Sequence, residues 1–417
     1  MGNVCTRAFA LVPPHHQRRS RWLLALILLY LGKKLLGPTL MSILLRWHYA
    51  RTAETPRLIY RKTPANKKLL SHCVTMTQTK YYPPWRLFNG HLQTIKFAFD
   101  KRAPQINYKR QLLDMPDGGV VSLDWALLPG HCPAEKEGGV LPHAENSSWI
   151  EGVDPTRRTA LLLPGLTGGS PANYVRFTVA RLHELSKKYD FGQEAFVGVG
   201  FSMGSNVLVK YLGEEGDQTP LTGAISVGNP FNLTKVSENL SGTLFNRLLY
   251  DKMLNRSKRA LFFEKSNAAE MFEGYPGLDM EAVRASRTVR EFDDTLTSVL
   301  FNYKNADEFY QDASSDKKLR AVKVPLLCIN AEDDPISVRT ALPSRTLVES
   351  CPNVILCVTK SGGHLAYYES SLRSDEEING RDGNDVRKST PTMWTAKPIA
   401  EFAEAVRLGK VTAANAA

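Results

Sequence analysis

A serine between two glycines is the first place in this chain where residue types and spacing point to chemistry. The segment 200–204, Gly-Phe-Ser-Met-Gly, follows an apolar run at 195–199 and precedes a helix-forming stretch at 205–212. A strand, this turn and a helix together hold a serine hydroxyl at the carboxyl edge of a parallel sheet. Glycine is needed on both sides because side chains there would collide. The pattern predicts that Ser202 is a catalytic nucleophile.

A serine hydroxyl needs a base, and the base needs a carboxylate to orient it. Two later strand-like runs, 324–330 and 354–359, lead into the acidic pair Asp333-Asp334 and into Gly-Gly-His364. Carboxyl ends of parallel strands meet at one edge of a sheet, and serine, acid, histidine is the chain order that accompanies such a turn. We predict Asp334 as the acid and His364 as the base, with Asp333 as the alternative acid. The simpler explanation, a turn cap and an unrelated histidine, does not account for all three residues at successive strand ends.

A glycine-rich segment also follows the strand-like run 159–163. Residues 164–170 read Pro-Gly-Leu-Thr-Gly-Gly-Ser, without the Gly-Lys-Ser/Thr ending of a phosphate-binding loop. Ester cleavage needs backbone N–H groups that stabilise the oxyanion, one of them from the residue after the nucleophile. We therefore expect the oxyanion hole to be formed by the N–H groups of Leu166 and Met203.

These segments belong to a longer ordered set of motifs. The set also contains Tyr-Pro-Pro at 82–84, Asn-Gly-His-Leu-Gln-Thr-Ile at 89–95, Asp-Gly-Gly at 117–119, Leu-Asp-Trp at 123–125, Phe-Asp-Asp at 292–294 and Asn-Ala-Glu-Asp-Asp-Pro at 330–335. From about residue 82 to the C-terminal helix, the chain resembles the AB-hydrolase 4 family. This family comprises membrane-associated α/β-hydrolase-domain esterases and lipases, including yeast medium-chain ethyl-ester synthase/esterases.

The resemblance implies an α/β-hydrolase fold, with a mostly parallel central sheet, helices on both faces and a helical lid. It also implies action on lipid esters, with Ser202 as nucleophile, His364 as base and acid, and Asp334 as the orienting carboxylate. Lids in this fold cover an acyl-binding cleft.

One departure from the family concerns the short interval between Gly165 and Ser202. Family topology requires a helix, a strand, a long loop and a second helix there, but only one helix fits, at about 172–188. The segment that carries the fourth strand, which lies between strands two and three, is therefore expected to be missing. We interpret the chain as a truncated variant or an incomplete gene model, and a complete strand between strands two and three would refute this.

Composition is consistent with one α/β domain and its extensions. The chain has 417 residues, of which 43% are hydrophobic, an ordinary value for a globular protein. Its six cysteines lack metal-binding or disulfide-framework spacing, and we expect no metal, cofactor or disulfide. The net charge of +11 accompanies no nucleic-acid-binding motif, so we expect no nucleic-acid partner. Attraction to anionic lipid headgroups explains the basic N-terminal region better, and a solvated basic tail is the alternative.

The N-terminal region also carries hydrophobic runs. Residues 22–31 and 35–47 are apolar but interrupted by Gly-Lys-Lys and by Gly-Pro. Each run is shorter than the roughly 20 residues that cross a bilayer, so a spanning anchor and an interfacial helix both remain open. The first six residues match a myristoylation pattern, with Gly2 as acceptor and Cys5 as a palmitoylation candidate.

The predicted organisation follows from these segments. It consists of a basic tail at 1–21, a membrane-associating segment at 22–47, a polar linker at 48–80 and an α/β-hydrolase domain at 81–410 with a lid at about 233–309. A closing helix is expected at 394–408.

We interpret the chain as a membrane-associated serine carboxylic ester hydrolase acting on acylglycerol, phospholipid or medium-chain fatty-acid esters. The expected location is the endoplasmic reticulum or another endomembrane, while the membrane face and the oligomeric state are left open. Two alternatives remain. One is a catalytically impaired membrane scaffold, and the other is an alcohol acyltransferase that pairs His364 with Glu369.

Overall fold

The computed structural model describes residues 37–116, 119–127, 159–186, 195–266, 268–370 and 392–414. They belong to two compact units, a smaller one at 1–53 with 370–392 and a larger one at 54–369 with 393–417. The described helix of the smaller unit is α3 (Gly37–Thr52). No helix within the described ranges has the length and apolar character needed to span a membrane. The lipidation candidates Gly2 and Cys5 and residues 22–36 lie outside those ranges.

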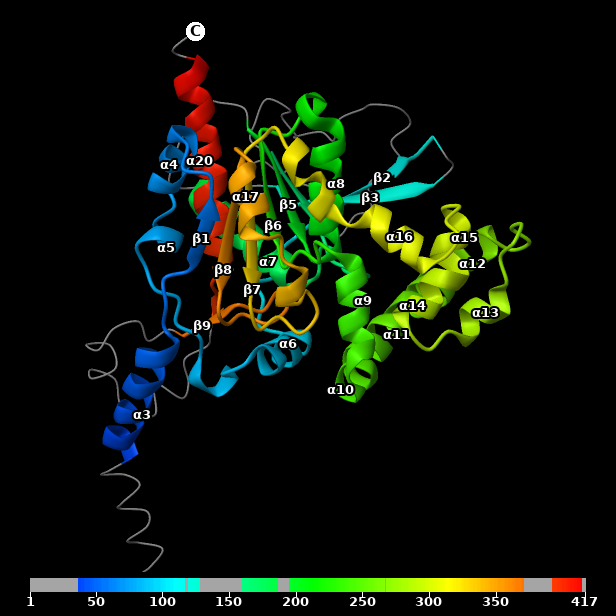
Figure 1. Cartoon of the computed structure of the whole chain (residues 1–417), viewed down its shortest axis with the longest axis horizontal. Coiled ribbons are helices and arrows are strands. Elements are labelled where there is room, and N and C mark those ends of the chain that lie inside the picture. The colour runs from blue at the N-terminus through cyan, green and yellow to red at the C-terminus, as the bar shows by residue number, and fades with distance from the viewer. Residues whose placement is uncertain are drawn as a thin grey trace, which may run out of the picture. The chain divides into compact units, whose positions relative to one another are not determined.

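A six-stranded sheet forms the centre of the larger unit (Figure 1). Its strand order is β1-β8-β7-β6-β5-β4, in which β4 to β8 run parallel and β1 pairs antiparallel with β8. The strands are β1 (Arg57–Tyr60), β4 (Thr159–Leu163), β5 (Phe196–Phe201), β6 (Gly223–Val227), β7 (Leu326–Ala331) and β8 (Val354–Thr359). The bounds of β4, β5, β7 and β8 confirm the strands expected from the apolar runs at 159–163, 195–199, 324–330 and 354–359.

Strands β6, β7 and β8 are buried along their whole lengths. Alternate residues point to opposite faces, so that Leu327 and Ile329 enter one hydrophobic core and Leu326 and Cys328 enter the other. Parallel strands covered on both faces need apolar residues at every position. This requirement explains why these segments read as continuous apolar runs.

Helices cover both faces of the sheet (Figure 1). One face packs against α8 (Met203–Glu215), η6 (Ser315–Ala321) and α17 (Arg345–Ser350). The other packs against α7 (Asn173–Ser186), α4 (Pro64–Ser71), α5 (Val74–Thr77) and the closing helix α20 (Ala396–Ala414). A mostly parallel sheet between two helical layers confirms the predicted α/β-hydrolase fold.

The segment 48–80 differs from the polar linker expected there. It contains strand β1 and the helices α4 and α5, and the side chains of Cys73 and Met76 are fully buried in the core. The short apolar stretch Leu58-Ile59-Tyr60 pairs with β8, which is a partner far along the chain. A four-residue strand flanked by polar residues gives too weak a periodic signal to be recognised alone.

The opposite edge of the sheet, among the residues that the structure describes, is the side on which the fourth strand was expected to be missing. Strand β4 is the edge strand, and β2 (Lys109–Asp114) and β3 (Val120–Trp125) form a separate two-stranded sheet. Within the described part of the chain, β4 has β5 as its only neighbouring strand. Strands β4 and β5 pair directly, as the short interval before Ser202 requires.

A helical insertion follows β6, in the range expected for a lid. Its elements are α9 (Leu233–Gly242), α10 (Leu244–Asn246), η3 (Arg247–Asp251), α11 (Lys252–Ala260), η4 (Leu261–Lys265), α12 (Ala268–Met271), α13 (Met280–Ala285), α14 (Val289–Phe292), η5 (Asp293–Thr297), α15 (Ser298–Leu300) and α16 (Ala306–Ala313). Three of them, η3, η4 and η5, are single π-helical turns. Between β1 and β2 lie η1 (Trp85–Leu87) and α6 (Gly90–Ala98), and β9 (Tyr368–Glu369) follows β8.

Candidate active site

Ser202 lies in a strained turn between β5 and α8. Its backbone has φ 52° and ψ −119°, a conformation that L-residues rarely adopt and that often marks functional sites. A Cβ atom at Gly200 would lie 2.5 Å from the Cα atom of Ser205, and one at Gly204 would collide with the main chain of Pro164. Glycine at both positions therefore allows the turn that carries the serine.

Asp334 lies in the turn directly after β7. Its Oδ1 atom accepts hydrogen bonds from the backbone N–H groups of Ile336 and Ser337, both at 2.8 Å. Its side chain is fully buried. The turn fixes one carboxylate oxygen and leaves Oδ2 facing His364.

His364 joins the two other residues. Its Nδ1 atom lies 2.9 Å from Asp334 Oδ2, and its Nε2 atom lies 2.8 Å from Ser202 Oγ. With Nδ1 protonated toward the carboxylate, Nε2 is left as the acceptor for the serine proton. The structure therefore brings together the three residues predicted from chain order, in an arrangement suited to activate a serine hydroxyl.

Asp333, the alternative acid, has a different partner. Its Oδ1 atom accepts a hydrogen bond from the backbone N–H of Gly363 at 2.9 Å. Burial, the largest cause, raises the pKa of this carboxyl to about 6; the hydrogen bond from Gly363 opposes this rise and the neighbouring charge of Asp334 contributes to it. Asp333 thus holds the glycine turn that presents His364, whose ring is hydrogen-bonded by Asp334.

The predicted oxyanion donors lie on either side of the nucleophile. A Cβ atom at Gly165 would lie 3.1 Å from Ser202 Cβ, which places the loop after β4 against the turn. Met203 is the first residue of α8, where an N–H group has no acceptor within the helix. Among the described residues, no hydrogen bond engages the backbone N–H of Leu166 or of Met203. Both N–H groups are thus free to stabilise a developing negative charge.

Tyr174 on α7 holds the loop after β4 by a hydrogen bond. Its hydroxyl accepts a hydrogen bond from the backbone N–H of Gly165 at 2.9 Å. The ring is buried and packs against Phe201 and Phe97, with centroid distances of 4.8 and 6.4 Å. Tyr174 therefore fixes the position of the loop that carries Leu166.

Comparison with known proteins identifies the family. No family model matches the chain. It is 30% identical to the embryogenesis-associated protein EMB8 of Picea glauca, over 83% of this chain and 77% of EMB8. The chain belongs to the AB-hydrolase 4 family.

Two other relatives have names that describe activities. The chain is 29% identical to phospholipase ABHD3 of Mus musculus, covering 78% of this chain and 81% of the relative. It is also 29% identical to monoacylglycerol lipase of Saccharomyces cerevisiae, covering 76% of this chain and 78% of the relative. The protein is a carboxylic ester hydrolase of the AB-hydrolase 4 family.

The Asn-Gly-His-Leu-Gln-Thr motif of this family packs directly beneath the histidine loop. Thr94 Oγ1 accepts a hydrogen bond from the backbone N–H of His364 at 2.8 Å and donates one to Gly90 O at 2.7 Å. Gln93 Oε1 accepts a hydrogen bond from Tyr368 N at 3.1 Å. The motif predicted family membership, but its positioning role was missed. Asn89 caps the helix of the motif, and its side chain accepts a hydrogen bond from Leu92 N, but this local cap does not reveal the contact with His364.

His91 of the same motif links the site to the helical insertion. Its Nδ1 atom lies 2.7 Å from the hydroxyl of Tyr250 on η3, and its ring meets Phe245 edge-on at 5.1 Å. Burial, followed by the charge of Asp334, raises the pKa of Tyr250 to about 12. Tyr250 therefore stays protonated at neutral pH.

The pairing of His364 with Glu369 suggested by the acyltransferase alternative is wrong. Glu369 on β9 forms an ion pair with Lys397 of α20. Both ring nitrogens of His364 are already engaged, by Ser202 and Asp334.

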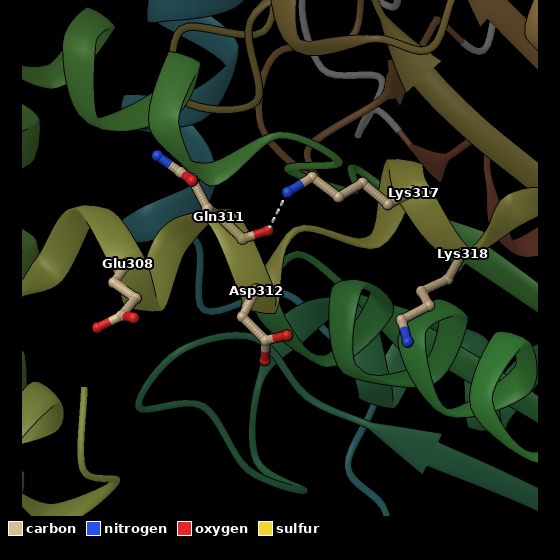
Figure 2. Close-up of a pocket in the computed structure, with 5 residues that line it drawn as sticks. All are labelled: Glu308, Gln311, Asp312, Lys317 and Lys318. Carbon is tan, nitrogen blue, oxygen red and sulfur yellow. Dashed lines mark hydrogen bonds between the residues drawn. The ribbon is translucent and has the colours of Figure 1, made fainter. Parts of the chain in front are cut away.

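A surface pocket of about 520 Å³ lies apart from these residues, where α16 meets η6 (Figure 2). Its lining is polar, consisting of Glu308, Gln311, Asp312, Lys317 and Lys318. Figure 2 shows Lys317 Nζ donating to the main-chain oxygen of Gln311, at 2.7 Å. A hollow lined by charged side chains suits neither an acyl chain nor ester cleavage. No group of three or more potential metal ligands occurs among residues with described positions.

Proposed function

We propose that this protein hydrolyses carboxylic esters of lipids at a membrane, through an acyl-enzyme formed on Ser202. The observation that supports this best is the continuous series of hydrogen bonds from Ser202 to His364 to Asp334, at 2.8 and 2.9 Å. Three side chains from distant parts of the sequence meet with geometry suited to proton transfer.

The proposed reaction has two steps. Ser202 Oγ attacks the ester carbonyl while His364 Nε2 takes its proton, and the N–H groups of Leu166 and Met203 stabilise the oxyanion. His364 then donates this proton to the leaving alcohol, and the acyl-enzyme forms. Water attacks the acyl-enzyme with His364 again as base, which releases a fatty acid and regenerates Ser202. Asp334 stabilises the imidazolium in both steps.

The substrate class is supported by the relatives, because one is named a phospholipase and another a monoacylglycerol lipase. Membrane association is supported by the apolar, basic N-terminal sequence, with Gly2 and Cys5 as candidate acylation sites. The endoplasmic reticulum or another endomembrane is the proposed location. We propose that an acyl-binding cleft lies under the helical insertion and determines whether an acylglycerol or a phospholipid ester is the substrate.

A fluorophosphonate probe tests the catalytic proposal. We expect it to label the purified chain and not a Ser202→Ala variant, and we expect hydrolysis of a short-chain p-nitrophenyl ester to disappear with the labelling. The matched control is Ser205→Ala, because Ser205 is buried on α8 and donates its hydroxyl to the main chain of Ser202. A folded wild-type chain without labelling would contradict the proposal and favour the scaffold alternative, which the open edge at β4 supports.

A further inference from the structure

The helical insertion carries an apolar strip that faces solvent. From Leu244 to Lys265 the elements α10, η3, α11 and η4 follow one another without a break, and we call this segment the docking helix. Leu244 is 64% exposed, Phe245 53% and Leu248 61%. Leu244 and Leu248 are four residues apart, so their side chains lie on one face of the helix. Neighbouring exposed apolar side chains of this size commonly mark an interaction surface.

The opposite side of the docking helix is firmly held by the rest of the insertion. Asn246 Nδ2 donates to Asn239 O at 2.9 Å, and Asn255 Nδ2 donates to Ser286 O at 2.9 Å. Asp251 is buried and accepts a hydrogen bond from Val289 N at 2.7 Å. The helix is therefore fixed in its orientation, and its apolar strip points outward because the packed side is already filled.

Basic side chains accompany the apolar strip. The docking helix contains six basic residues and two acidic ones. One acidic residue, Asp251, is buried. Arg247, Lys252 and Arg256 are exposed, and the charge of Arg247 also acts on the buried Asp251. An apolar strip flanked by exposed basic groups is the pattern of a helix that lies in the headgroup region of an anionic bilayer.

The docking helix also lies beside the proposed active site. Tyr250 on its inner side hydrogen-bonds His91, and Phe245 contacts the same ring. Figure 1 shows α10 and α6 close together at the end of the sheet where β7 and β8 end. Leu92 on α6 and Phe88 before it are exposed as well, 36% and 63% respectively. Exposed apolar side chains are therefore present on both α6 and α10, and the two helices meet through the contact of His91 with Phe245.

We propose that the docking helix binds the larger unit to an anionic phospholipid surface, with Leu244 and Leu248 among the acyl chains and Arg247, Lys252 and Arg256 at the headgroups. This contact places the entrance of the active site against the lipid that supplies the ester. The inference rests on the proposed function for its substrate, but the contact itself requires no catalysis.

Hydrogen–deuterium exchange of the full chain tests the contact directly. Vesicles of phosphatidylcholine with phosphatidylglycerol should slow exchange of peptides within 244–261 severalfold, and vesicles of phosphatidylcholine alone should slow it less. The same protection is expected in Ser202→Ala. Unchanged exchange in this segment with anionic vesicles would overturn the proposal, even if other parts of the chain become protected.

Hydrolysis provides the second measurement. In the double variant Leu244→Ser with Leu248→Ser, we expect hydrolysis of esters embedded in anionic vesicles to fall about tenfold, whereas hydrolysis of a soluble short-chain ester changes less than twofold. The matched control is Met271→Ser with Phe301→Ser, since these side chains of the same insertion are 63% and 68% exposed and lie outside the docking helix. Equal losses in the two double variants would contradict the proposal.

The basic groups are tested separately by replacing Arg247, Lys252 and Arg256 with glutamine. We expect this variant to lose the preference for anionic over neutral vesicles, and a retained preference would contradict their role. A chain that hydrolyses no ester but still shows protection of 244–261 would refute the proposed function and support the docking surface. An active chain without protection of 244–261 would support the proposed function and refute the docking surface.

Discussion

Strands β5 to β8 and strand β4 share one sheet but differ in burial. The first group is almost entirely buried, whereas β4 is partly exposed and Leu161 on it retains 36% of its surface. Ser202 follows β5, Asp334 follows β7 and His364 follows β8. The loop after β4 carries only the predicted oxyanion donor Leu166. Among the described residues, the sheet therefore ends at the strand on which the Ser-His-Asp cluster depends least.

This difference suggests how a sheet with β4 at its described edge can still present Ser202 to His364. Direct pairing of β4 with β5 preserves the register that sets the loop after β4 against Ser202. Strand β4 is then an edge strand. On its outer side, its backbone groups and apolar side chains have no neighbouring strand among the described residues.

The largest expected effect concerns the acid on the buried side. Replacing Asp334 by asparagine should lower kcat about 10³- to 10⁴-fold, because an amide cannot hold His364 in the required tautomer. Replacing Asp333 by asparagine should lower kcat less than about tenfold, since that side chain accepts the backbone N–H of Gly363, whereas Asp334 is the partner of the His364 ring. Steady-state kinetics on a soluble ester measures both. Equal losses would mean that the two carboxylates act as one unit.

The next largest effect compares how much a leucine on the buried strand β7 and one on the edge strand β4 contribute to the free energy of unfolding. Leu327→Ala on the fully buried β7 should lower the free energy of unfolding by about 2–5 kcal/mol, because it leaves a cavity between packed strands. Leu161→Ala on β4 should cost less than about 1 kcal/mol. Denaturant unfolding of the two variants checks this. A larger loss at Leu161 would show that the edge is covered.

A smaller effect depends on pH. The pKa of Asp333 is raised by burial to about 6 from an ordinary value of 3.8. A carboxyl whose pKa is raised on folding stabilises the protein when it is protonated, and this stabilisation is lost as pH rises from about 4 through 6.

Asp333→Asn keeps the acceptor oxygen for Gly363 but carries no charge. The variant should therefore become more stable relative to the wild type, by about 1–3 kcal/mol, between pH 4 and pH 7. Urea unfolding at several pH values measures the difference, and a constant difference would contradict the assignment.

The smallest effect tests the catalytic contribution of the edge. Tyr174→Phe leaves the Gly165 N–H without its acceptor and loosens the loop that carries Leu166. We expect kcat to fall about tenfold with little change in KM, since the oxyanion is stabilised in the transition state. Tyr108→Phe is a useful comparison, because the Tyr108 hydroxyl binds Ser170 O at the far end of the same loop. A rise in KM with unchanged kcat would indicate a role in binding instead.

Much of the site could be predicted because the fold makes local demands on sequence. The turn at Ser202 requires glycines at fixed positions, and parallel buried strands require apolar runs whose ends are easy to find. The choice between Asp333 and Asp334 was harder. The two residues are consecutive in one turn, and their different partners, Gly363 and His364, are set by the tertiary structure.

Contacts between distant segments gave no local signal. Thr94 meets His364 N across 270 positions of sequence, and nothing in the spacing of either residue reveals the pair. Strand β1 was missed for a similar reason, since its partner β8 lies near the other end of the chain.

The placement of β1 has a consequence for how the chain folds as it is made. Strands β4, β5, β6, β7 and β8 lie side by side in the order of their synthesis, so the sheet can grow at one edge as each strand leaves the ribosome. Strand β1 is made before all of them, yet it pairs only with β8, the last. Leu58 and Ile59 therefore have no strand partner during most of translation. A nascent chain that ends before Thr359 cannot complete the pairing of β1 with β8.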